Sequence, residues 1–307
     1  MHAAVVFLAQ LLLAGVRSST PVLLVLLGET LTQRVGVINL GVEGEMLVGA
    51  AGGFAITAVT GNPWLGLVAA MLAGLLLSGA HALLCLGFKV NQIASGVCVL
   101  TLGSGLSAYY GAPYVGRQIA GFANPSGFAS MPALAPLLAA LTPTVVIALA
   151  ITPMIGVWLY KTRTGLIWRT VGESTEAARM VGIKPWRVQL AGILAGGLLA
   201  GLGGAALSVD YTRTWVEGMT AGRGLVAVGL VVVARWNPWL ALPAALLFGG
   251  SEALYLRLQS LGVTVSPYLL STLPYLIPLA VLLGSYRSAR RTGGMPQELT
   301  SIFKGVQ

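Results

Sequence analysis

Long apolar segments alternate with short polar stretches along the whole chain. Within each segment the apolar residues are continuous, as in a membrane-spanning helix, and do not alternate with polar residues as they do in the strands of a β-barrel. The pattern predicts an all-α polytopic membrane protein with about ten transmembrane or partial helices. These segments lie at about 3–16, 21–33, 44–60, 64–88, 92–111, 141–160, 188–208, 222–234, 238–258 and 266–284.

Some of these segments are short, and two are the clearest cases. Residues 21–33 and 222–234 do not reach the ~17 residues that a span needs. A helix that ends inside the bilayer leaves backbone polar groups unpaired, so it is tolerated only where protein surrounds it. We therefore expect both segments to be partial or broken helices inside the bundle.

The composition agrees with a membrane protein and excludes two other classes. Of 307 residues, 56% are hydrophobic and 9% are charged, and the mean hydropathy is +0.84. A soluble domain carries roughly 25% charged residues, which excludes a soluble enzyme. The apolar content is too high for a disordered chain. Cys85 and Cys98 both lie in apolar segments and indicate neither a disulfide framework nor a redox motif.

The positions of lysine and arginine predict the orientation. The net charge is +9, from 18 basic and 9 acidic residues. If the N-terminus is cytoplasmic and ten segments alternate, 13 basic residues fall inside and five outside, in agreement with the positive-inside rule. Both termini are then predicted to be cytoplasmic. Residues 112–140 form an extracytoplasmic loop in this arrangement, and residues 161–187 form a cytoplasmic loop.

The sequence contains an internal repeat. Residues 62–74 and 237–249 both begin with Asn-Pro-Trp-Leu, and nine of their 13 positions are identical. Upstream of them, a Val-Glu-Gly triplet occurs at 42–44 and again at 216–218. Because Asn62 falls outside and Asn237 inside, the copies run in opposite directions. This predicts a 5+5 inverted repeat with halves at about 1–111 and 141–286, which is typical of alternating-access transporters. The alternative is an old duplication that now serves only the architecture.

Small residues recur at four-residue spacing along 191–204, from Ala191 to Gly204. Such spacing lets helix backbones approach closely in a membrane. It predicts a helix in the interior of the bundle and does not by itself indicate a substrate site.

The cytoplasmic loop carries a short helix signature. Ser174 is a good N-cap, Glu176 falls in the first turn, Gly182 suits the position after the last turn, and Pro185 stops continuation. Ala177 and Ala178 leave a flat, small face, which we interpret as a docking surface for a cytoplasmic protein. The alternative is an ordinary basic loop on anionic lipid.

These residues carry a resemblance to a known family. Glu176-Ala177-Ala178 followed by Gly182 resembles the coupling-loop motif of ABC importer permeases. Residues 36–46, 91–96 and 221–225 resemble the branched-chain amino acid/ribose permease superfamily and, within it, the nucleoside-type (simple sugar/nucleoside) permeases. Asn-Leu-Gly at 39–41 stands where the sugar branch tends to carry Asp-Leu-Ser, which favours the nucleoside branch. The similarity extends over about 20–290.

The resemblance implies one transmembrane permease domain over 1–307, in a bacterial or archaeal inner membrane. Such permeases pair as homo- or heterodimers in lipid, bind cytoplasmic ABC ATPases and receive substrate from an extracytoplasmic binding protein, with no nucleic acid involved. The chain has no Gly-x-x-x-x-Gly-Lys-Ser/Thr loop, so ATP and Mg²⁺ are expected in the partner ATPase. We expect that this chain is not an enzyme and binds no cofactor. The implied function is import of nucleosides or related small polar solutes by alternating access.

Two sets of candidate residues follow. The set expected to couple transport to the ATPase is Gly172, Glu173, Glu176, Ala177, Ala178, Arg179, Gly182 and Ile183. The set expected to line or gate the substrate pathway is Asn39, Glu43, Glu45, Asn91, Gln92, Ser95 and Glu217. The acids among them are chosen because ionisable groups at membrane depth are costly and are commonly functional. The alternatives are ion pairs, in which Arg34 serves Glu29 or Glu45, and Arg213 serves Glu217.

Two other functional classes remain open at this point. An ion-coupled secondary transporter of a small polar solute also fits an inverted repeat, with Glu29 or Glu252 as the coupling carboxylate. A membrane protease would need Ser104 and His81 to meet as a nucleophile–base pair. His2 and His81 alone do not make a metal site with cysteines this far away.

Overall fold

The computed structural model describes residues 2–122, 140–260, 266–288 and 294–304. Over these residues the fold is helical apart from one isolated bridge, Gln118 to Thr214. Seven helices in the described part are long and apolar enough to cross a membrane. The longer elements are α1 (His2–Arg34), α2 (Val42–Thr60), α3 (Pro63–Ala82), α4 (Gln92–Gly111), α6 (Pro143–Lys161), α9 (Pro185–Ala205), α10 (Arg223–Val233), α11 (Pro238–Ser260) and α13 (Leu273–Ser288).

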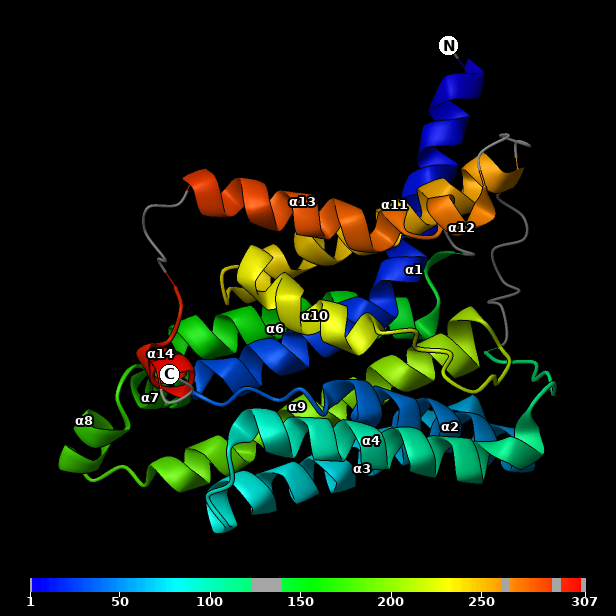
Figure 1. Ribbon diagram of the computed structural model, residues 1–307. Coiled ribbons are helices and arrows are strands. Elements are labelled where there is room, and N and C mark those ends of the chain that lie inside the picture. The colour runs from blue at the N-terminus through cyan, green and yellow to red at the C-terminus, as the bar shows by residue number, and fades with distance from the viewer. Residues whose placement is uncertain (1, 123–139, 261–265, 289–293, 305–307) are drawn as a thin grey trace.

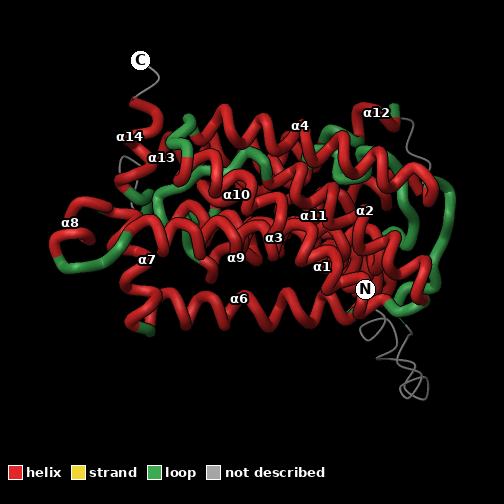
Figure 2. Tube along the Cα trace, turned by 90° about the horizontal axis from the view of Figure 1, so that it is seen from below, coloured by secondary structure: helices red, strands yellow, loops and turns green. Residues whose placement is uncertain are grey.

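Shorter elements complete the described chain. Two π-helical turns extend α3 and α9, namely η1 (Leu83–Gly87) and η4 (Ala206–Tyr211). Three short helices, α7 (Arg163–Glu173), α8 (Thr175–Met180) and α14 (Gln297–Lys304), lie together at one end of the bundle (Figures 1 and 2), which we call the α8 end. The others are η2 (Ala112–Tyr114) and α12 (Pro267–Leu270).

Segments 3–16 and 21–33 form one helix, so the predicted division between them is wrong. Pro21 lies inside α1, where its missing N–H normally kinks or ends a helix. Here α1 bends and continues (Figure 1), packed along α11. The hydroxyl of Ser18 donates to the Gly249 carbonyl of α11 at 2.6 Å. With one helix in place of two, the start of α1 and helix α14 lie at opposite ends of the bundle (Figure 1), unlike the predicted placement of both termini on one side.

Helix α9 lies at the centre of the bundle, between α2 and α3, as its small residues predict. A Cβ atom on Gly201 would overlap the Ala70 carbonyl oxygen of α3. A Cβ on Gly204 would overlap the Met46 carbonyl oxygen of α2. Because these glycines have no side chain, the three helix backbones are in direct contact.

Helix α10 is a partial helix, as the sequence predicts. Its 11 residues span ~16 Å at 1.5 Å per residue, about half of a bilayer core. Helix α2 also begins inside the bundle, because the loop 35–41 runs back from the end of α1 before α2 starts (Figure 1). Two helix N-termini therefore lie within the protein.

Several helices that contain or flank the repeated sequence pack against one another. Helix α1 packs on α11, and α9 packs on α3. Helix α2 packs on α9, and α10 packs on α1. Asn62 and Asn237 each accept a hydrogen bond from the backbone N–H two residues later, at 3.0 and 3.1 Å, where α3 and α11 begin. In Figure 1 these two helices run in opposite directions.

Candidate functional site

A buried polar cluster joins α1, α2 and the loop between them. It comprises Glu29, Gln33, Asn39 and Glu45, all nearly or completely inaccessible. Glu29 Oε1 accepts from Gln33 Nε2 at 3.0 Å and from the Asn39 backbone N–H at 3.3 Å. Asn39 Nδ2 donates to Glu45 Oε1 at 2.8 Å, and the second Glu45 oxygen has no partner. Asn39 therefore bridges two buried carboxyl groups. Within the described residues no lysine or arginine forms an ion pair with either group.

The loop 35–41 is held on both sides by residues of α3 and α4. Gln92 Oε1 accepts from the Ile38 N–H at 2.8 Å. The His81 ring bridges the Ile38 carbonyl, 3.2 Å from Nε2, and the Ser95 hydroxyl, 3.0 Å from Nδ1. Gln92 and Ser95 therefore fix the loop that carries Asn39, a role that their spacing in the sequence does not reveal.

Glu43, in the first turn of α2, binds the chain at the start of α10. Its carboxylate accepts from the Thr220 hydroxyl at 2.5 Å and from the backbone N–H groups of Gly222 and Gly224 at 2.8 and 2.6 Å. Gly224 lies in the first turn of α10, where a helix N-terminus favours an anion. A Cβ on Gly224 would lie 2.7 Å from the Glu43 Cα, so glycine is required for this approach. We call these contacts the Glu43 clamp.

The sequence interpretation missed an ion pair between Arg223 and Glu252. Arg223 Nη2 donates to Glu252 Oε1 at 2.6 Å, which links α10 to α11. The Tyr275 hydroxyl of α13 donates to the Ala221 carbonyl at 2.6 Å and holds the same turn. Arg223 and Glu252 lie on different segments, and only the fold brings them together.

Two of the candidate pathway residues lie elsewhere. Asn91 is an exposed N-cap of α4 and accepts from the N–H groups of Ile93 and Ala94. Glu217 is exposed in the turn before α10, and no ion pair joins it to Arg213 in the described structure. Neither side chain takes part in the buried polar cluster or the Glu43 clamp.

Arg34 does not pair with Glu29 or Glu45, contrary to the alternative considered from the sequence. It donates instead to the Trp236 carbonyl at 2.7 Å and to the Tyr160 hydroxyl at 2.9 Å. These bonds tie the end of α1 to α6 and to the turn between α10 and α11.

The protease-like arrangement is also wrong. Ser104 is exposed on α4, whereas His81 is buried and contacts Ser95. The geometry therefore provides no nucleophile–base pair from Ser104 and His81.

The loop 161–187 contains the predicted short helix, α8, preceded by a second helix, α7, that the sequence interpretation missed. Ser174 Oγ accepts from the Ala177 N–H at 3.1 Å and caps α8. Glu176 lies in the first turn, and Gly182 follows the helix with φ +80°. The local prediction of the helix and its ends is thus confirmed.

The surface of α8 differs from the predicted flat alanine face. Ala177 is exposed, but Ala178 is completely buried. Met180 and Val181 are 84% and 71% exposed and present apolar side chains at the tip. Glu173, Glu176, Arg179 and Gly182 are exposed as well, Ile183 is half-buried, and Gly172 is buried against the Arg34 carbonyl. The exposed face therefore combines charges with two large apolar side chains.

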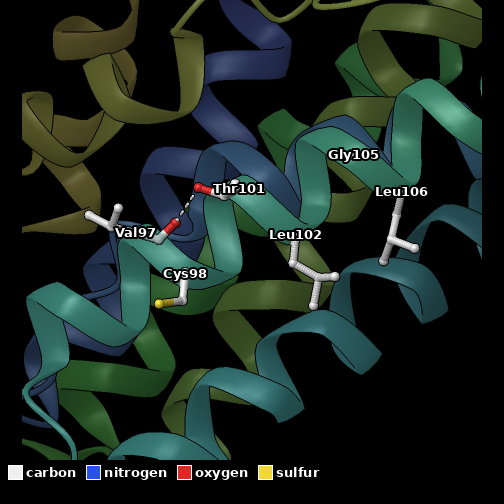
Figure 3. Close-up of a pocket in the computed structure, with 6 residues that line it drawn as sticks. All are labelled: Val97, Cys98, Thr101, Leu102, Gly105 and Leu106. Carbon is white, nitrogen blue, oxygen red and sulfur yellow. Dashed lines mark hydrogen bonds between the residues drawn. The ribbon is translucent and has the colours of Figure 1, made fainter.

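One face of α4 carries a shallow recess that is unrelated to these polar groups. Figure 3 shows that all of its lining residues come from this single helix. The Thr101 hydroxyl donates to the Val97 carbonyl at 3.0 Å, so the lining offers no free hydroxyl donor for a polar solute. The lining residues are Val97, Cys98, Thr101, Leu102, Gly105 and Leu106.

Comparison with known proteins gives a family match over residues 11–285, to the model described as the permease component of the branched-chain amino acid transport system. A putative glucose ABC transporter permease protein of Haloferax volcanii is 40% identical, over 90% of this chain and 91% of the relative. The guanosine ABC transporter permease protein of Bacillus subtilis is 29% identical, over 91% and 93%. The nucleoside ABC transporter permease protein of Lactococcus lactis is 30% identical, over 75% and 77%. No solved structure matches.

Proposed function

The chain belongs to the family of branched-chain amino acid transport permease components, and from this we propose that α8 is the surface through which a separate ATPase drives transport. The protein is the permease subunit of an ABC importer and a multi-pass protein of the inner membrane. The family supports neither a secondary transporter nor a membrane enzyme. ATP and Mg²⁺ belong in this proposal to the cytoplasmic ATPase. A second permease subunit and an extracytoplasmic binding protein complete the transporter.

The observation that carries the proposal is the form and place of α8. It is a separately capped helix that lies beyond the membrane-spanning helices at one end of the bundle (Figure 1). Its exposed apolar tip, Met180 and Val181, is flanked by the charges of Glu176 and Arg179. An apolar centre with a polar rim is the usual make-up of a protein–protein interface. In this proposal the α8 end faces the cytoplasm.

We propose a nucleoside or a sugar as the substrate. The relatives named above are assigned to glucose, guanosine and nucleosides, which share hydroxyl-rich rings. Recognition of such solutes needs hydrogen-bonding groups rather than a fixed charge. The buried polar cluster and Gln92 supply amides and carboxyl oxygens of that kind.

We propose that the two repeat halves move against each other during transport, as in other proteins with inverted repeats. The support is the packing of α1 on α11 and of α9 on α3, together with the opposite directions of α3 and α11. The Glu43 clamp spans the two halves. In this proposal it holds one of the two arrangements, and Asn39 and Glu45 line the pathway that opens when the halves move.

The variant Ala177→Trp tests the role of α8. Ala177 is exposed, so a large side chain leaves the fold intact but obstructs an ATPase groove. We expect ATP-driven uptake into proteoliposomes to fall about tenfold, because a buried interface does not accommodate the added volume. The amount of ATPase that co-purifies with the permease should fall in parallel.

Leu166→Trp is the matched control, because Leu166 is an exposed apolar residue of the neighbouring helix α7. Its uptake should stay within twofold of the unmodified protein. Wild-type uptake and ATPase recovery in Ala177→Trp would refute the assignment of α8.

A further inference from the structure

We infer that the C-terminal helix α14 positions α8, and that Glu298 is the positioning residue. Glu298 Oε1 accepts a hydrogen bond of 2.6 Å from the backbone N–H of Thr175, the first residue of α8. The first N–H groups of a helix have no partner within the helix. A carboxylate that binds one of them satisfies a donor and favourably meets the positive end of the helix dipole. The two residues are 123 positions apart, so this contact fixes α8 to a remote part of the chain.

Helix α14 is itself firmly seated on the bundle. Leu299 is 1% exposed and joins the main hydrophobic core, and Pro296 is buried beside Gly172 of α7. In Figure 1, α14 lies against α7 at the α8 end. The Glu298 carboxylate is therefore presented from a fixed support.

The same glutamate also lies beside the loop that leads to the buried polar cluster. A Cβ on Gly36 would lie 2.7 Å from the Glu298 Cβ, and Gly36 adopts φ +81°. Gly36 lies in the loop 35–41, which carries Asn39 into contact with Glu45. One side chain thus binds α8 through its carboxylate and lies beside the loop connected to the proposed pathway.

This arrangement has a mechanical consequence for α8. Six residues are too few for an isolated helix to be stable, so α8 depends on its cap and its neighbours. The Ser174 cap fixes only local backbone, whereas the Glu298 bond fixes the helix relative to α14 and the neighbouring loop 35–41. A displacement of α8 by the ATPase is then transmitted to the loop 35–41. The inference rests on the proposed function of α8.

The test compares Glu298→Ala with Glu298→Gln in the complete transporter, reconstituted with its ATPase and binding protein. The readout is the number of substrate molecules taken up per ATP hydrolysed. We expect a five- to tenfold lower ratio for Glu298→Ala, with ATP hydrolysis itself largely retained. Glu298→Gln keeps an oxygen that accepts from Thr175 and should recover at least half of the wild-type ratio. Gln297→Ala, an exposed neighbour on α14, should match the unmodified protein.

Two outcomes would overturn the inference. One is a wild-type ratio in Glu298→Ala, and the other is an equal loss in Glu298→Ala and Glu298→Gln. Size-exclusion profiles and thermal stability of each variant separate a change in coupling from a loss of fold. If Ala177→Trp blocks transport but Glu298→Ala does not, only the role of Glu298 fails. If Ala177→Trp has no effect either, the proposed function of α8 fails first.

Discussion

Glu43→Ala is expected to reduce uptake at least about 100-fold while the protein still reaches the membrane. The substitution removes the acceptor for one hydroxyl and two backbone N–H groups at the start of α10. A buried donor left unpaired costs ~1–3 kcal/mol, so the loss of all three acceptor contacts weakens the contact between the two halves by about 3–9 kcal/mol. Since ~1.4 kcal/mol corresponds to a factor of ten in an equilibrium, the clamped arrangement loses most of its population. Binding-protein-dependent uptake into vesicles measures this loss.

Glu43→Gln and Glu217→Ala sharpen that experiment. Glutamine retains one acceptor oxygen but turns an N–H₂ group toward a backbone donor, so we expect an intermediate loss. Glu217 occupies the repeat position of Glu43, yet its side chain is exposed, and Glu217→Ala should lower uptake less than twofold. If both alanine variants failed equally, the negative charge at the two repeat positions would matter, and the hydrogen bonds of the Glu43 clamp would not explain the result.

Gly201→Val is expected to destabilise the fold by about 3 kcal/mol or more, at the upper end of the cost of overfilling a packed core. The first added carbon already overlaps the Ala70 carbonyl oxygen, and the backbone of Gly49 approaches from α2. Helix α9 cannot yield, because α2 and α3 enclose it on two sides. The thermal midpoint of the detergent-solubilised protein and its folded yield should both fall.

Gly229→Val provides the comparison for Gly201→Val. A Cβ on Gly229 of α10 meets no atom within 4 Å, so the same substitution should shift the thermal midpoint by no more than a few degrees. Equal destabilisation at the two positions would mean that valine acts through helix propensity, and that close packing of α9 is not the cause.

Features that depend on residues close together in the sequence were predictable from the sequence. The cap at Ser174, the left-handed Gly182 and the short helix α10 follow from spacing and length alone. The continuity of α1 through Pro21 was not predictable in this way, because packing on α11 outweighs the local preference of proline. The burial of Ala178 likewise depends on how α8 lies against the bundle.

The candidate site was predictable as a set of residue types and not as a set of contacts. Asn39 and Glu45 are only six positions apart, so the short loop that enters α2 is enough to bring their side chains together. The partners of Glu43 lie 177 to 181 positions away, and no local pattern indicates them. The repeat suggested Glu217 as the equivalent of Glu43. In the structure Glu217 is exposed, and the backbone N–H groups of Gly222 and Gly224 bind Glu43 instead.

The two Asn-Pro-Trp turns have a consequence for how the protein sits in lipid. Trp64 and Trp239 are 54% and 50% exposed and occupy equivalent positions in helices that run in opposite directions. Tryptophan prefers the boundary between the acyl chains and the headgroups. We propose that the two tryptophans anchor opposite leaflets, so that the distance between them sets the hydrophobic thickness that the protein matches. Bilayers much thinner or thicker than this spacing would tilt the bundle or deform the surrounding lipid.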